Sequence, residues 1–178
     1  MSSSVQVSPR QRQIAKFVAA LEQLDAAGRA RLKRNAGRTL GEARDIHRVF
    51  FQALPYEVPE YVYEDYFLVA TLFPLAPHQE NAGSFGTAMR QVRHIRNGAE
   101  RANSLDRRFQ TLIDSEREQL PFRLRQAVRL IAADRLPIDW IALLRDLLGW
   151  ELDGKPVQLR WAKDYFVGQP EAAPTSEP

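Results

Sequence analysis

The stretch "EYVYEDYFLVATLFPLA", residues 60–76, decides the fold because its apolar side chains are not confined to one face. Wound into a helix, it carries aromatic and aliphatic residues nearly all round: Tyr61, Tyr63, Tyr66, Phe67, Leu68, Val69, Leu72 and Phe73. A helix that is apolar on every side is typical of the buried centre of a bundle. The sequence on either side should therefore supply the helices that surround it.

Helix-terminus signals divide the segment that precedes this stretch. "SPRQ" (8–11) combines a capping serine, a proline at the first helical position and the glutamine of a capping box. The helix that begins there is expected to end at Gly28, and a short basic helix follows over residues 29–36. "TLGE" (39–42) is a second capping box and predicts a helix that ends before Pro55.

The segment that follows residue 76 has the same helical punctuation. Ser84 and Ser104 are expected to cap two helices, and apolar residues at helical spacing predict three more over 120–131, 140–148 and 156–167. The last of these is expected to turn three aromatic side chains inward: Trp161, Tyr165 and Phe166. No segment alternates as a strand would, so the predicted fold class is all-α.

Length and composition fit one domain. The 178 residues are enough to bury a substantial core, and 44% of them are hydrophobic. We expect a single compact bundle of about eight helices over residues 9–167, a flexible N-terminus over 1–8 and a disordered tail over 168–178. The chain has no cysteine, no apolar run long enough to span a bilayer and no signal-peptide pattern, so a cytoplasmic protein without membrane contact is expected.

Basic residues are segregated along the chain, although the net charge is only +3. Residues 10–48 hold ten Lys and Arg against four acidic residues, and residues 90–129 hold ten against five. Residues 49–89, between these two basic blocks, hold no Lys or Arg at all. Of the 25 basic residues 21 are Arg, whose planar fork of donors suits phosphate. A GC-rich genome would also favour Arg, but it does not explain the segregation.

Groups that would assemble an enzyme site are missing from the sequence. His47, His78 and His94 do not pair at the spacing of a helical metal site, and the glycines lack the lysine of a phosphate-binding loop. The acidic residues Glu57, Glu60, Glu64 and Asp65 are interpreted as a solvated acidic face. We therefore expect a protein that is not an enzyme and that has no metal and no cofactor.

The arginines of the second block are arranged as a phosphate-binding surface would need. Arg90, Arg93 and Asn97 fall along one side of the helix that begins at Ser84. Arg107 and Arg108 would lie in the first turn after Ser104, where backbone N–H groups also attract anions. Arg123, Arg125 and Arg129 complete the block. The alternative for any single arginine is a pair with a neighbouring carboxylate.

Several segments in series resemble one family. They are "ARLKRNAG", "EARDIHRVF", "SFGTAMRQVRHIR", "LDRRFQTLIDSEREQLPFRLRQAVRLI", "LPIDWIALLRDLLGW" and "VQLRWAKDYF". Together they cover residues 12–167 and are similar to the CasB family, the small subunit of the type I-E CRISPR Cascade complex. The resemblance implies a non-catalytic, all-helical subunit, present as two copies, that lies along the duplex of guide RNA and target. There it holds the displaced DNA strand beside other Cascade subunits.

The resemblance also implies which residues bind nucleic acid. Five match basic positions of the family: Lys33, Arg34, Arg107, Arg108 and Arg125. The charge pattern adds four more: Arg31, Arg90, Arg93 and Arg123. Such a basic surface would bind the crRNA and the target DNA through their backbones, without sequence preference.

Two other classes of protein remain open at this point. One is a helix-turn-helix regulator that reads base edges with the helix at 84–97. The other is a protein scaffold whose arginines pair with acidic partners, which would co-purify with protein alone and would not respond to nuclease.

Overall fold

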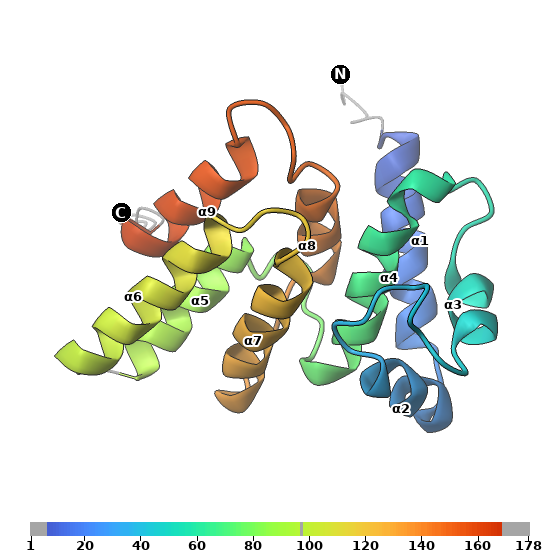
Figure 1. The fold of residues 1–178 in the computed structure, drawn as a ribbon, viewed down its shortest axis with the longest axis horizontal. Coiled ribbons are helices and arrows are strands. Elements are labelled where there is room, and N and C mark those ends of the chain that lie inside the picture. The colour runs from blue at the N-terminus through green and yellow to red at the C-terminus, as the bar shows by residue number, and fades with distance from the viewer. Residues whose placement is uncertain (1–6, 97, 169–178) are drawn as a thin grey trace, which may run out of the picture.

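The computed structural model describes residues 7–96 and 98–168, and the predicted flexible N-terminus and disordered tail lie largely outside them. Within those ranges the chain is all-helical, as predicted, and His78 and Ile138 form an isolated bridge (Figure 1). Nine α-helices and two 3₁₀ turns follow one another: α1 (Pro9–Glu22), α2 (Ala26–Arg34), α3 (His47–Ala53), η1 (Glu60–Val62), α4 (Tyr63–Leu72), η2 (Phe73–Leu75), α5 (Phe85–Ile95), α6 (Ala99–Ile113), α7 (Leu120–Ala133), α8 (Trp140–Leu147) and α9 (Pro156–Phe166). None of these helices is both long and apolar enough to cross a membrane.

Helix α4 forms the centre of the core, which confirms the interpretation for residues 65–73, whereas Tyr61 at the start of the stretch is exposed. Every residue from Asp65 to Phe73 is buried. Tyr66 meets Phe17 of α1 edge to face at 4.9 Å between ring centroids, and Phe67 meets Phe50 of α3 at 5.3 Å. Because α4 also contacts α2, α7 and α8, it links the N-terminal half of the chain to the C-terminal half.

The predicted boundary between the first two helices was wrong. Helix α1 begins with the predicted capping box at Ser8 but ends at Glu22. Gly28 lies inside the first turn of α2, because the side chain of Asp25 accepts a hydrogen bond from the Gly28 N–H at 2.7 Å and caps a new helix there. Asp25 is therefore the start signal that the sequence interpretation missed.

The second predicted capping box makes its hydrogen bond without starting a helix. Glu42 accepts from the Thr39 N–H at 3.1 Å, yet the chain stays in turns until α3 begins at His47. A buried tertiary contact explains this difference. Asn35 donates to the carbonyls of Arg31 and Arg44 and accepts from the Arg44 N–H, so the turn after α2 is tied back to α2 itself.

In the C-terminal half, α9 packs against α5 and α6, and α7 packs against the same two helices (Figure 1). The α5–α9 contact is close at Gly86, where a Cβ atom would lie only 2.3 Å from the carbonyl oxygen of Trp161. Trp161 and Tyr165 point inward as predicted, but Phe166 is about half exposed, contrary to the prediction. It follows Tyr165 directly, so it lies on another side of α9.

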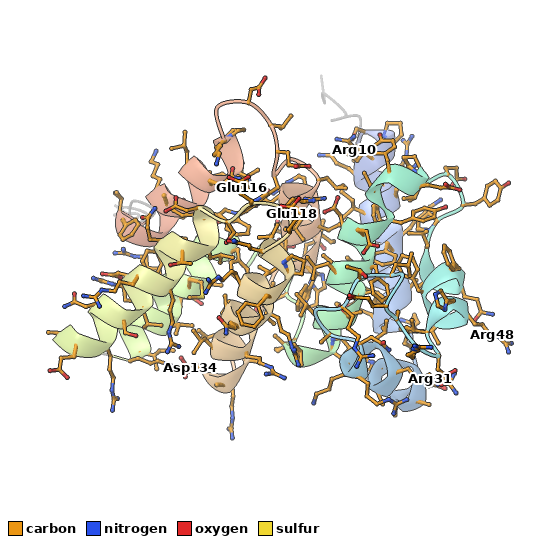
Figure 2. The ribbon with its side chains drawn as sticks, in the orientation of Figure 1. Arg10, Arg31, Arg48, Glu116, Glu118 and Asp134 are labelled. Carbon is orange, nitrogen blue, oxygen red and sulfur yellow. The ribbon has the colours of Figure 1, made fainter. Side chains whose placement is uncertain are left out.

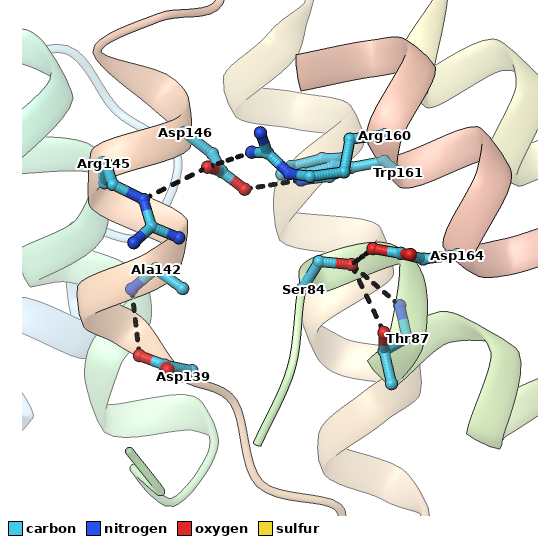
Figure 3. Close-up of polar contacts among 9 residues, drawn as sticks. All are labelled: Ser84, Thr87, Asp139, Ala142, Arg145, Asp146, Arg160, Trp161 and Asp164. Atoms are coloured by element: carbon cyan, nitrogen blue, oxygen red, sulfur yellow. Dashed lines mark hydrogen bonds and ion pairs between the residues drawn. The ribbon is translucent and has the colours of Figure 1, made fainter. Parts of the chain in front are cut away.

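A buried carboxylate holds α8 against α9 (Figure 3). Asp146 of α8 accepts a hydrogen bond at 2.7 Å from the indole N–H of Trp161 and pairs with Arg160. Ser84 caps α5 as predicted, since it accepts from the Thr87 N–H, and it also donates to Asp164 of α9 at 2.5 Å. These contacts hold α9 against α8 and against α5, the first helix of the second basic block.

Candidate nucleic-acid interface

The first group of predicted site residues lies in the last turn of α2. Lys33 and Arg34 are exposed, and Arg31 lies 3.6 Å from Asp45, a pair that solvent screens. Cations in the last turn of a helix are favoured by the helix dipole, so this cluster is compatible with the stability of α2.

The second group borders a groove between α6 and α7. The groove holds a cavity of about 130 Å³ whose floor includes Leu112. The cavity is lined by Arg107 and Arg108 of α6 and by Arg123 and Gln126 of α7. The structure thus brings together three predicted residues that are up to sixteen positions apart in sequence. Among the described residues, no carboxylate oxygen lies within 4.0 Å of the side-chain nitrogens of Lys33, Arg34, Arg107 and Arg108.

The structural setting predicted for Arg107 and Arg108 was wrong. Helix α6 begins at Ala99, five residues before the predicted cap Ser104, so both arginines lie in the middle of the helix. Their backbone N–H groups are therefore used within the helix. Any anion that binds here meets guanidinium groups and no free helix terminus.

Arg125 connects the two groups. Its alkyl chain lies against the turn after α2, where a Cβ atom on Gly37 would come within 3.0 Å of Arg125 Cδ. The Nε atom of Arg125 is buried and has no acceptor among the described residues. Gly37 is three residues after Arg34, which places their Cα atoms within roughly 11 Å. Helix α7 consequently lies between the α6 cations and the α2 cations (Figure 1).

Arg90 and Arg93 have partners inside the protein. Arg90 donates at 2.9 Å to the carbonyl of Tyr165, in the last turn of α9. Arg93 donates at 2.8 Å to Asp106, which also accepts a hydrogen bond at 2.7 Å from the Tyr165 hydroxyl. The expected phosphate stripe on α5 is thus engaged in holding α5 to α6 and α9, and its third member, Asn97, lies outside the described residues.

Electrostatics are consistent with a structural role for this cluster. Burial opposes ionisation of Asp106, but the hydrogen bonds from Arg93 and Tyr165 outweigh it, so the pKa of Asp106 lies below its ordinary value. Burial and the hydrogen bond to Asp106 raise the pKa of Tyr165 above its ordinary value. The carboxylate is therefore ionised and the phenol neutral at pH 7.

Other basic residues are more dispersed than their sequence clustering indicates. Figure 2 shows Arg10 and Arg31 at opposite ends of the N-terminal half and Arg48 on its outer side. Arg129 of α7 and Arg38 of the turn after α2 are exposed near Arg125 and Gly37, although neither is among the nucleic-acid-binding residues predicted from the sequence.

The acidic residues mark the limits of the cationic surface on α7. Glu116 and Glu118 precede the helix and Asp134 ends it, so the basic positions lie between them (Figure 2). Asp134 itself pairs with Arg96 at 2.8 Å. The interpretation of Asp65 as part of a solvated face was wrong, because Asp65 is buried and pairs with Arg117.

Residues that could bind a metal are not gathered in the described part of the chain. No group of three His, Cys, Asp or Glu side chains with suitable placement occurs there. His78 is held at the backbone of Ile138 and Trp140, at 3.3 Å to each, and His47 and His94 are exposed.

The fold and the charges define an all-helical protein with a cationic surface that runs from α6 across α7 to α2. Residues 28–166 match the family described as CRISPR-associated protein Cse2, and the chain therefore belongs to the Cse2 family. The expectation from the sequence motifs is confirmed.

Individual relatives agree with this assignment. The CRISPR-associated protein Cse2 of Thermus thermophilus is 36% identical over 103 residues, which cover 58% of this chain and 56% of that protein, little more than half its length. The crystal structure of CasB from Thermus thermophilus has a TM-score of 0.71 at 30% identity and covers 90% of this chain and 99% of that chain. A chain of a CRISPR RNA-guided surveillance complex shares the fold, with a TM-score of 0.71 at 23% identity, covering 87% of this chain and 92% of that chain.

Proposed function

We propose that this protein is the non-catalytic small subunit of a type I-E CRISPR surveillance complex in the cytoplasm. Its partners are the crRNA, the target DNA with its displaced single strand, the other Cascade subunits and a second copy of itself. Its membership of the Cse2 family and the likeness of its fold to a surveillance-complex chain support this role.

The observation that carries the proposal is the cationic surface on α2, α6 and α7. Six residues contribute to it: Lys33, Arg34, Arg107, Arg108, Arg123 and Arg125. None of the six has a carboxylate partner in the part of the chain that the structure describes, so a phosphate would not have to displace an internal ion pair. Arg90 and Arg93, which hold α5 against its neighbours, and Arg31, which lies 3.6 Å from Asp45, are left out of the proposed surface.

Binding of this kind is electrostatic and indifferent to sequence. Each phosphate that a cation neutralises releases condensed counterions, which gives a slope of about −0.7 per contact in a plot of log affinity against log salt for a single strand. Six contacts would give a slope of about −4. Base pairing between guide and target supplies the sequence specificity, and the small subunit contributes backbone contacts.

The test is a salt titration of binding to a labelled single strand, a duplex and an R-loop. The variant Lys33→Glu/Arg34→Glu/Arg108→Glu should bind much more weakly, and its slope should fall to about −2 because three contacts are lost. The control variant Arg10→Glu/Lys16→Glu/Arg48→Glu changes the net charge equally at exposed positions of α1 and α3. Far-UV circular dichroism checks that both variants are folded.

The two variants separate the competing outcomes. Loss of binding in the first variant alone supports the proposed surface, and a preference of wild type for the R-loop supports the surveillance role. Equal loss in both variants would indicate attraction by net charge only. Binding that depends on one duplex sequence would indicate a regulator, and co-purification with protein that nuclease does not affect would indicate a scaffold.

A further inference from the structure

An exposed aromatic side chain lies in the middle of the cationic surface. Phe122 of α7 is 56% exposed. Three of the other exposed aromatic residues of the described chain, Phe51, Tyr56 and Tyr61, belong to the segment 49–89, which has no Lys or Arg. Phe122 differs from them because it is next to Arg123 in sequence and in space.

The helical register of α7 places Phe122 between the two groups of cations. Residues 122, 126 and 129 share the outward face of the helix, opposite the buried stripe of Leu120, Leu124, Val128 and Ile131. Arg123 faces one side, toward the α6 groove, and Arg125 faces the other, toward Gly37. A strand that passes from α6 to α2 therefore crosses the outward face of α7, which carries the ring of Phe122.

Arg123 also supports the ring directly. Its guanidinium carbon lies 5.7 Å from the centroid of the Phe122 ring, within the range of a cation–π contact. This contact places a phosphate-binding group beside the ring. An aromatic face next to a guanidinium is the combination that binds single strands, because the base stacks while its phosphate is neutralised.

We propose that Phe122 is a stacking platform for an unpaired base, so that this surface prefers a single strand to a duplex. The inference rests on the proposed function, since the arginines bring the strand to the ring. In a duplex the bases are paired and stacked on one another, so only phosphates can be contacted. In a single strand a base can leave its neighbours and lie on the ring.

The experiment measures dissociation constants by fluorescence anisotropy for three labelled probes. They are an ordinary single strand, a strand of equal length with abasic sites throughout, and a duplex. Phe122→Ala should weaken binding of the ordinary strand by about tenfold, within the range of about five- to 150-fold expected for one stacked base. The substitution should leave the affinities for the abasic strand and the duplex unchanged, and it should not change the salt slope.

Two further variants control for other effects of the substitution. Phe122→Trp should keep the affinity for the ordinary strand, because the indole also stacks. Tyr56→Ala, which removes a 99% exposed ring from the segment without Lys or Arg, should change nothing.

Each remaining outcome has a definite meaning. If Phe122→Ala weakens binding of the abasic strand as much as binding of the ordinary strand, or weakens neither, the stacking role is wrong while the phosphate-binding surface stands. If wild type binds no probe even at low salt, the proposed function fails and the stacking role fails with it.

Discussion

Replacing Asp106 by alanine should destabilise the fold by about 2 kcal/mol without reducing the affinity for nucleic acid. Asp106 accepts hydrogen bonds from Arg93 at 2.8 Å and from the Tyr165 hydroxyl at 2.7 Å. The Arg93 pair is partly exposed and contributes roughly 0.2–1 kcal/mol. Tyr165 is buried, and a buried hydroxyl without an acceptor costs about 1–3 kcal/mol. For a chain of this size, the sum corresponds to a fall in Tm of about 4–8 °C.

The pH dependence of the stability difference between wild type and Asp106→Ala identifies the Asp106 carboxylate as the source of that difference. Because the folded-state pKa of Asp106 is lowered, its contribution to stability is complete above the ordinary pKa of about 3.9 and is lost as pH falls through the lowered value. Urea unfolding of wild type and Asp106→Ala should therefore differ by a constant amount from pH 8 to about pH 5. The difference should shrink below about pH 4.

A double-mutant cycle with Tyr165→Phe completes the test. The two substitutions remove the same hydrogen bond, so together they should cost less than the sum of their separate effects. Additive effects, or a stability difference that does not change with pH, would refute the assignment of the network. Loss of nucleic-acid affinity in a folded Arg93→Gln variant would contradict the structural role of Arg93.

Two further substitutions test the packing between elements. Gly86→Ala should lower the urea midpoint by an amount equivalent to roughly 1–3 kcal/mol or more, because the new Cβ would lie 2.3 Å from the carbonyl oxygen of Trp161. The control Gly41→Ala should be close to neutral, because no atom lies within 4 Å of its new Cβ. Burial raises the pKa of Asp65 despite its pair with Arg117, so ionisation of Asp65 lowers stability as pH rises from about 4. The stability of Asp65→Asn, measured by urea unfolding across this range, should therefore improve relative to wild type as pH rises, and a constant difference would contradict the burial argument.

Local sequence signals were sufficient for most of the fold. The part of the apolar stretch from Asp65 to Phe73 is buried as predicted, and the capping residues Ser8 and Ser84 begin α1 and α5. Such signals act over a single turn, so they identify elements that local interactions already favour. The all-α class follows from them without knowledge of the tertiary contacts.

The same signals failed where a distant contact or a competing cap decided the outcome. Thr39 and Glu42 make their local hydrogen bond, but Asn35 holds the backbone of Arg44 and the chain forms turns. Ser104 resembles a cap, yet α6 had already begun at Ala99. A capping motif predicts a hydrogen bond more reliably than it predicts the helix that would follow.

Prediction of the candidate site from the sequence had a similar limit. Charge spacing identified both basic blocks, but it could not distinguish Arg93, whose partner Asp106 is thirteen residues away, from the exposed Arg108. Nor could it place Arg125 against Gly37, since 88 residues separate them. Whether an arginine is free for a ligand depends on the tertiary structure, which residue type and spacing do not specify.

The contact between Arg125 and Gly37 makes the proposed surface a property of the whole fold. Its α2 cations belong to the N-terminal half and its α6 and α7 cations to the C-terminal half, and the contacts of α4 with α7 and α8 hold the halves together. Gly37 has a positive φ of 81°, which a side chain would strain, so glycine both forms the turn and leaves room for Arg125. A strand bound across α6, α7 and α2 would contact both halves at once. Binding would therefore stabilise the folded chain against separation of its halves, since a ligand that binds only the native arrangement shifts the equilibrium toward it.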